Sequence, residues 1–169
     1  MNFESFLSSF LPSFSATVIG GGLLTLIFFL LREKVYKSID LDGSWTYEQE
    51  TTVSDYNPYK YMTVRYLALV ARVDHKIYGT AEKDSEKERY KEWKGYNGKH
   101  RTQIKITGHI EKHYFSKDRI CIHITEYGEK RESSTLHILQ EEKHNELSGR
   151  FVSTIANQQG NVKWTRRSS

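Results

Sequence analysis

The residue types that usually carry enzyme chemistry form no motif in this chain. Cys121 is the only cysteine and lies in a predicted strand without a sequence-evident base, and neither a Cys-x-x-Cys nor a His-Glu-x-x-His pattern occurs. The one glycine run, Gly20 to Gly22, lies in an apolar segment and not in a phosphate-binding loop. We therefore predict a protein that is not an enzyme and has no catalytic residues.

The seven histidines are scattered along the chain and predict no metal site. His109 and His113 are four positions apart in a predicted strand, so they would share a face but stand about 13 Å from each other. That separation is too large for one ion. Solvent-exposed strand positions explain these histidines more simply than metal ligation does.

Aromatic and cationic side chains are a more plentiful resource for binding. Aromatic residues make up 13% of the chain, and the formal net charge of +4 comes entirely from the part beyond residue 40. A modest excess of this kind suits a small anionic ligand or an anionic membrane surface. It is too weak for a protein that binds a nucleic acid duplex, which we do not expect as a partner.

An N-terminal apolar segment predicts a membrane anchor. Residues 14–31 are apolar or small throughout, and as a helix they would measure roughly 27 Å, close to the ~30 Å hydrocarbon core of a bilayer. Only Glu4 is charged before this segment, whereas three cations follow it, which is unlike a signal peptide and places the following domain in the cytoplasm. These cations are Arg32, Lys34 and Lys37. We predict a single-pass anchor at residues 1–37 in the lipid bilayer, with the transmembrane helix at about 14–31.

Two features of this anchor are open at the sequence level. Residues 3–11 carry apolar side chains at helical spacing and end at Pro12, so they either lie in the membrane interface or lengthen the span. Gly20, Gly21 and Gly22 create small-xxx-small patterns that let transmembrane helices pack closely, which favours a homo-oligomer. The alternative is that glycine is simply common in transmembrane helices.

Residues 38–169 have the pattern of a strand-rich domain. Strands are predicted at 45–50, 63–73, 104–110, 119–124, 136–139, 147–155 and 162–166, with further candidates at 76–83 and 89–95. Residues 82–94 could alternatively form a short helix, but we favour a hairpin at Asp84-Ser85. About eight strands without a covering helix hide their edges best as an antiparallel up-and-down β-barrel, with a sandwich as the alternative.

A few residues at the ends of this domain are more specific than its strand pattern. Gly43 and Trp45 open the first strand, and Arg166 follows Trp164 near the end of the last. This resembles lipocalin-like and avidin-like barrels, in which an arginine of the terminal strand stacks on a tryptophan of the first. The resemblance implies that Trp45, Trp164 and Arg166 form a structural plug at the barrel floor; a ligand contact is the alternative role for Trp45.

The layout of the whole chain resembles the transmembrane β-strand-rich effectors of bacterial cyclic-oligonucleotide anti-phage defence (CBASS and related guard systems). Members of that family typically carry two transmembrane helices, whereas this chain has one. The resemblance implies a cytoplasmic barrel that binds a cyclic dinucleotide or trinucleotide made by a partner nucleotidyltransferase or cyclase. It also implies an oligomer that disrupts the bacterial inner membrane, with the nucleotide either activating it or holding it inactive. No other cofactor is expected.

Such a ligand needs rings on which its bases stack and cations for its phosphates. The candidate ligand-binding residues are Tyr47, Tyr66, Arg72, Tyr78, Tyr90, Trp93, Thr107 and Arg150. Tyr66 and Arg72 share one face of their strand by parity, and the tyrosine-rich loop 55–61 could close over the barrel mouth. For each ring the alternative is ordinary barrel core, and for each arginine it is a solvated outer face. The alternative functions are a membrane-tethered, lipocalin-like carrier of an apolar molecule and an interaction module with a filled barrel.

Overall fold

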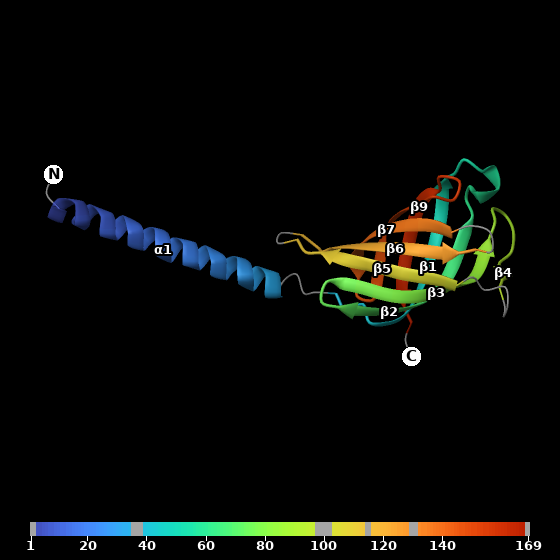
Figure 1. Ribbon diagram of the computed structural model, residues 1–169, viewed down its shortest axis with the longest axis horizontal. Helices are drawn as coiled ribbons and strands as arrows, with labels where there is room; N and C mark the ends of the chain where they lie inside the picture. Colours follow the sequence, from blue (N-terminus) through green and yellow to red (C-terminus); the bar gives the residue numbers. More distant parts are fainter. Residues whose placement is uncertain (1–2, 35–38, 97–102, 114–115, 129–131, 168–169) are drawn as a thin grey trace. The chain divides into compact units, whose positions relative to one another are not determined.

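The structure of the protein, a computed structural model, describes residues 3–34, 39–96, 103–113, 116–128 and 132–167. It divides into two compact units, one that holds a long N-terminal helix and one that holds the strands (Figure 1). Each unit is described by itself below.

The helix α1 spans Phe3–Lys34 and continues through Pro12. Residues 3–11, which the sequence assigned either to the membrane interface or to a longer span, belong to the same continuous helix. Pro12 is the tenth residue of the helix, where its missing N–H removes one intrahelical hydrogen bond. Phe10–Leu31, a stretch of 22 residues, is long and apolar enough to cross a membrane. None of that stretch is buried against the rest of the chain.

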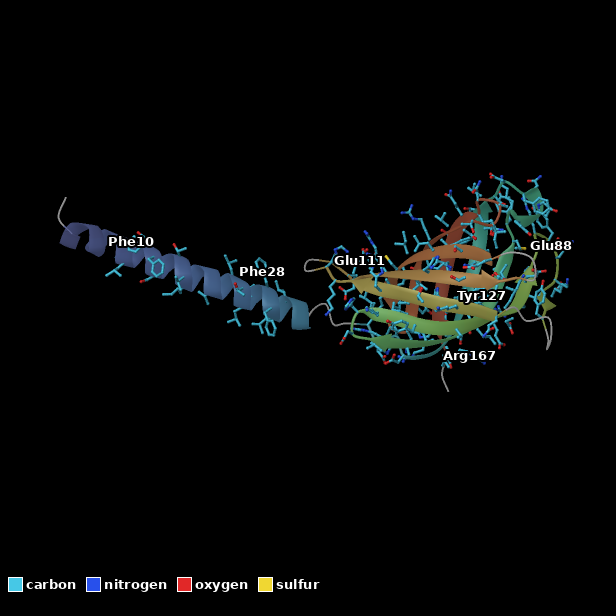
Figure 2. All side chains as sticks on the ribbon, viewed as in Figure 1. Phe10, Phe28, Glu88, Glu111, Tyr127 and Arg167 are labelled. Carbon is cyan, nitrogen blue, oxygen red and sulfur yellow. The ribbon has the colours of Figure 1, made fainter. Side chains whose placement is uncertain are left out.

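Three hydroxyl side chains within this apolar stretch are satisfied by the helix itself. Each of the three donates a hydrogen bond of 2.8–2.9 Å to the carbonyl oxygen four residues earlier, which suits a surrounding without water. These hydroxyls belong to Ser15, Thr17 and Thr25. The large apolar side chains of this stretch, which extend from α1 in Figure 2, are exposed.

The second unit is a closed antiparallel β-barrel, as the sequence predicted. Its strands are β1 (Gly43–Val53), β2 (Thr63–Val73), β3 (Lys76–Lys87), β4 (Lys94–Gly95), β5 (Gln103–Glu111), β6 (Arg119–Tyr127), β7 (Glu132–Lys143), β8 (Glu146–Ser153) and β9 (Gln159–Arg166). Every long strand pairs with the preceding and following long strand, and β9 pairs with β1 to close the barrel (Figure 1). The two-residue β4 pairs only with the end of β3. The up-and-down order with eight long strands excludes the sandwich alternative.

Residues 82–94 differ from their prediction. The strand β3 runs through Asp84-Ser85 without a turn and ends at Lys87, so the predicted hairpin position was wrong; the chain reverses between Lys87 and β4. The alternative helix does not occur there either. A β-bulge opposite Arg65 and Tyr66 adds one residue to β3 at this point. Because a bulge breaks the two-residue period, Asp84 resembles a turn in the sequence.

The barrel has two different ends. We call the end where β1 begins and β9 ends the floor, and the end where β1 ends and β2 begins the loop end. Side chains that fill the floor half are apolar, and the largest of them expose 2% of their surface or less. They include Trp45, Ile77, Ile120, Leu139, Leu147 and Trp164.

The floor is closed by contacts between the first and last strands. Trp45 donates a hydrogen bond from Nε1 to the carbonyl oxygen of Leu41 (2.9 Å), and the Arg166 guanidinium lies 5.7 Å from the centroid of the Trp45 ring. Arg166 also donates to the Asp40 carboxylate at 3.1 Å. A backbone hydrogen bond from Asp42 and this guanidinium lower the pKa of Asp40. Gly43 precedes the tryptophan with φ +117°, a conformation that other residues rarely adopt.

Candidate ligand site at the loop end

An aromatic stack occupies the middle of the barrel. The Tyr47 ring lies between the rings of Tyr66 and Trp164, with centroid distances of 4.6 and 4.4 Å and interplanar angles of 13° and 14°. All three side chains are buried. Tyr47 and Tyr66 alternate inward on the paired strands β1 and β2, where they lie directly opposite each other. The stack therefore forms the inner limit of anything that enters from the loop end.

His137 completes this central layer. Its Nδ1 accepts a hydrogen bond from the Trp164 indole N–H (3.1 Å), and because indole nitrogen only donates, the ring proton must be on Nε2. The Gln49 amide lies 2.5 Å from Nε2, and the amide orientation that satisfies this N–H presents oxygen to it. Complete burial lowers the pKa of His137 to about 3, so the imidazole is neutral at physiological pH.

The Tyr47 hydroxyl is a buried polar group without a hydrogen-bond partner among the described residues. Burial, together with the neighbouring Tyr66 and Glu126, raises the pKa of Tyr47 well above its ordinary value, so the hydroxyl keeps its proton. A buried hydroxyl without a partner costs about 1–3 kcal/mol. The Tyr47 hydroxyl could therefore donate a hydrogen bond to a ligand or a water molecule that reached it from the loop end.

Charged side chains lie between this hydroxyl and the loop end. Lys83 and Glu86 form an ion pair of 2.8 Å, and their side chains expose only 19% and 17% of their surface. The Lys83 ammonium lies 4.6 Å from the centroid of the Tyr96 ring. Burial alone would raise the pKa of Glu86, but the Lys83 ammonium and the Tyr96 hydroxyl hold it below its ordinary value.

Outside this pair, rings and guanidinium groups gather at the loop end. The Arg89 guanidinium lies 4.5 Å from the Tyr61 ring centroid and 4.8 Å from that of Tyr90, and the Arg65 guanidinium lies 4.3 Å from that of Trp93. Tyr90 exposes 89% of its surface. Tyr61 precedes β2, and the other four residues belong to β2 or the segment between β3 and β4, near Glu88 in Figure 2. We call these five residues the rim cluster.

The eight candidate ligand-binding residues do not form one site. Tyr47 and Tyr66 lie in the central aromatic stack, and Tyr90 and Trp93 lie in the rim cluster. The other four lie elsewhere. Arg72 is at the floor end, where it donates to the Ile39 carbonyl oxygen at 2.6 Å, while Tyr78 and Thr107 pair across β3 and β5 on the outer face and Arg150 is exposed on β8.

Tyr66 and Arg72 lie on the same face of β2, as their even spacing predicted, but they are not neighbours. Both belong to the inward-facing set of β2, yet six residues of strand separate them by roughly 20 Å. The expected role for loop 55–61 fits its place in the fold better, because it joins β1 to β2 at the loop end. Tyr61 of this loop is anchored by a backbone hydrogen bond of 2.7 Å to Thr51.

Sequence reasoning missed several residues of the loop-end region. Arg65, Arg89 and Tyr61 were not singled out because their partners are remote in the sequence or in segments of uncertain period. Lys83 carried a usable signal, since it continues the inward series of Ile77, Gly79 and Ala81 on β3. A lysine at an inward position predicts a buried ion pair or a ligand contact. The neighbouring bulge concealed that signal.

A second group with possible binding chemistry lies away from the loop end. His109, Glu111 and Cys121 offer ligand atoms that are all within 4.8 Å of one another on the outer face of β5 and β6. His109 pairs directly with Cys121 across these strands, and Glu111 follows two residues later on the same face. Figure 2 labels Glu111 at the end of the barrel opposite Glu88.

Comparisons with known proteins bear on the fold alone. No protein-family model and no curated protein matches the chain in sequence. Among solved structures, a redesigned β-barrel is similar, with a TM-score of 0.50 and 12% sequence identity, over 76% of this chain and 92% of the designed one. At that identity the likeness shows a shared barrel fold and carries nothing about ligands, partners or activity.

Proposed function

We propose that this protein is a membrane-anchored anti-phage effector that binds a cyclic dinucleotide or trinucleotide at the loop end of its barrel. In this proposal, association of the α1 helices permeabilises the bacterial inner membrane in response to the nucleotide. A partner nucleotidyltransferase or cyclase supplies the ligand. The observation that carries the proposal is the rim cluster, in which the Arg89 guanidinium lies against the rings of Tyr61 and Tyr90. The second guanidinium of the cluster, that of Arg65, lies against the Trp93 ring and is already paired with Glu48 at 2.7 Å.

The rim cluster has the two kinds of group that a cyclic nucleotide requires. Bases stack on aromatic faces, each such contact being worth about 1–3 kcal/mol, and guanidinium groups bind phosphate oxygens through a fixed fork of donors. In the described part of the chain, Arg89 contacts rings and no carboxylate, so its donors are available to a phosphate. Tyr90 offers an almost fully exposed face beside it.

Charge inside the barrel indicates how such a ligand would be oriented. Glu86 and Glu126 would repel phosphate groups, and Lys83 is already paired with Glu86. Phosphates are therefore expected at the rim. A base that enters beyond it meets carboxylates, which accept hydrogen bonds from its amino groups, and the unpartnered Tyr47 hydroxyl.

A carrier of an apolar molecule is the alternative, and the barrel interior argues against it. Such a carrier needs an empty apolar space, whereas Trp45, Tyr47 and Trp164 fill the middle and floor of the barrel and expose at most 1% of their surface. A fatty acid would have to displace the aromatic stack. A fatty acid nevertheless belongs in the binding experiment as the probe of this alternative.

The binding half of the proposal is tested with the full chain in lipid nanodiscs. We expect cyclic dinucleotides or trinucleotides to raise the free energy of unfolding by about 2.7 kcal/mol at a hundredfold excess over the dissociation constant. Arg89→Ala should weaken binding about tenfold or more. The matched control is Arg150→Ala, which removes an exposed arginine that shares an outer hollow with Glu48 and Glu50 and should change nothing. If the nucleotide panel has no effect and fatty acids stabilise the protein, the carrier function replaces this one.

The membrane half of the proposal is tested with Gly21→Leu. A Cβ atom at Gly21 meets no atom of the described residues within 4 Å, so leucine fits the single helix but holds neighbouring helices apart. We expect normal insertion, unchanged nucleotide binding and loss of membrane permeabilisation, measured by propidium entry and membrane fractionation. Ile19→Leu, an exposed position on the opposite side of α1 from Gly21, is the control and should still permeabilise. A Gly21→Leu protein that inserts and permeabilises normally would refute packing at this glycine.

A further inference from the structure

Three side chains on the outer face of the barrel have the donor set of a transition-metal site. His109 and Glu111 project from β5 and Cys121 from β6. The pairing of His109 with Cys121 places these two directly opposite, and residues in such pairs have Cβ atoms about 4.5–5.5 Å apart. The β-barrel fixes this spacing because both strands pair on each side with further strands.

The distances between the donor atoms approach those around one tetrahedral ion. His109 Nε2 and Glu111 Oε1 are 3.5 Å apart, which is long for a hydrogen bond. With metal bonds of about 2.0–2.3 Å, two ligand atoms of a tetrahedral zinc ion stand about 3.3–3.6 Å apart. The third donor, the Cys121 sulfur, lies within 4.8 Å of both. A small rotation of its side chain closes the remaining gap.

Arg119 orients the carboxylate of this group. Its Nη1 lies 3.4 Å from Oε2 of Glu111, the oxygen that does not face His109. A metal bound to Oε1 would leave this contact in place. Outer-sphere partners of this kind fix the orientation of a ligand and commonly change metal affinity 10- to 100-fold.

We propose that His109, Glu111 and Cys121 form a zinc-binding site on the outer face of the barrel. Sulfur, imidazole nitrogen and carboxylate oxygen are the three protein ligand types that Zn²⁺ accepts in tetrahedral sites. Magnesium and calcium prefer oxygen ligands only, so thiolate excludes them. Three protein ligands leave one coordination position of a tetrahedral ion unfilled, and His109 and Cys121 also line a surface hollow next to the group. Water or a group of another molecule completes the site there.

Cobalt(II) binding to the full chain is the test, because cobalt reports both the ligand type and the geometry. The protein is purified in nanodiscs without a polyhistidine tag and titrated with Co²⁺ alone. We expect one equivalent to produce a sulfur-to-cobalt charge-transfer band together with the intense visible bands of four-coordinate cobalt, and Zn²⁺ to abolish both. Cys121→Ser should remove the charge-transfer band, and His109→Ala and Glu111→Gln should each weaken binding at least about tenfold.

Two further variants separate this site from unspecific binding. Arg119→Ala should weaken binding while keeping the charge-transfer band, because it removes only the orienting contact. His144→Ala removes an exposed histidine in the turn between β7 and β8 and should change nothing. The proposal is wrong if the wild type shows no charge-transfer band at excess cobalt, or if His109→Ala binds as tightly as the wild type. The site is independent of nucleotide binding, so neither result decides the proposed function.

Discussion

The barrel interior contains a few buried polar side chains that differ in whether their hydrogen-bonding groups have partners. The His137 imidazole accepts a hydrogen bond from the Trp164 indole N–H, and its own N–H donates to the Gln49 amide. The Tyr47 hydroxyl, in contrast, has no hydrogen-bond partner among the described residues. The rings of Tyr47 and His137 pack against neighbouring aromatic rings, with centroid distances of 4.4 to 6.2 Å. Replacing one of these polar groups therefore tests hydrogen bonding with little change in packing.

The Tyr47 hydroxyl should lower the stability of the unliganded protein. Tyr47→Phe keeps the ring between Tyr66 and Trp164 and removes the unpartnered group, so we expect the free energy of unfolding to rise by about 1 kcal/mol. Chemical denaturation of the two proteins measures this difference. A loss of 1 kcal/mol or more would mean that the hydroxyl has a partner, such as a bound water.

His137 should make stability depend on pH in the acidic range. The pKa of His137 is about 3 in the folded protein, whereas the ordinary value for histidine, which applies in the unfolded chain, is 6.5. At a pH between these two values, the unfolded chain therefore binds a proton that the folded chain does not. Its contribution to the free energy of unfolding is therefore complete above pH 6.5 and falls by up to about 1.4 kcal/mol per pH unit below it.

The measurement compares denaturation at about pH 7 and about pH 5. His137→Gln should reduce the loss of stability between these pH values, whereas His144→Gln, at an exposed turn, should leave it unchanged. An identical loss in all three proteins would show that His137 is not the group responsible.

At the scale of elements, the strands approach one another closely at glycines. Gly149 on β8 faces the β7 backbone, and a Cβ atom there would lie 2.0 Å from the carbonyl oxygen of Ile138. Backbone atoms yield less readily than side chains. Gly95 on β4, by contrast, has no atom of a described residue within 4 Å of the corresponding position.

This contrast supplies a matched pair of variants. Gly149→Ala should lower the free energy of unfolding by about 1–3 kcal/mol or more, because the barrel wall must open to admit the methyl group. Gly95→Ala should stay within about 0.5 kcal/mol of the wild type. Equal stability of the two variants would show that β7 and β8 can separate without cost at this point.

At the scale of the whole molecule, the chain joins an apolar helix to a barrel that has its own core. The apolar stretch of α1 buries nothing within the chain, and the barrel core consists of residues between Ile39 and Trp164. This division fits an anchor and a separate ligand-binding domain. The side of the membrane on which the barrel lies is instead predicted from the charges that flank the apolar stretch.

The positive residues that follow the apolar stretch of α1 predict a cytoplasmic barrel. A reporter enzyme that is active only outside the cytoplasm, fused after Ser169, should be inactive in cells, and a reporter that works only in the cytoplasm should be active. The physical reason is that Arg32, Lys34 and Lys37 resist transfer across the membrane during insertion. The reverse pattern of reporter activity would place the barrel outside and remove its access to a cytoplasmic nucleotide.

Local sequence patterns were enough to predict both parts of the fold, the apolar helix and the β-barrel. An uncharged apolar run indicates α1, because a membrane-spanning helix needs only length and hydrophobicity. Alternation with period two predicts most strands, and the run 63–73 matches β2 residue for residue. Closure into a barrel follows because eight strands without a covering helix must otherwise leave edges unpaired.

Only the tertiary structure decided which of those residues meet. Alternation assigns a side chain to a face of a strand but not to an end of the barrel, so Tyr66 and Arg72 share a face and are remote from each other. His109 and Cys121 become neighbours through the register of β5 and β6, and Arg89 reaches Tyr61 because the loop before β2 and the segment after β3 come together at the loop end. Strand register and barrel closure are set by the packing of the whole core, which no local period in the sequence contains.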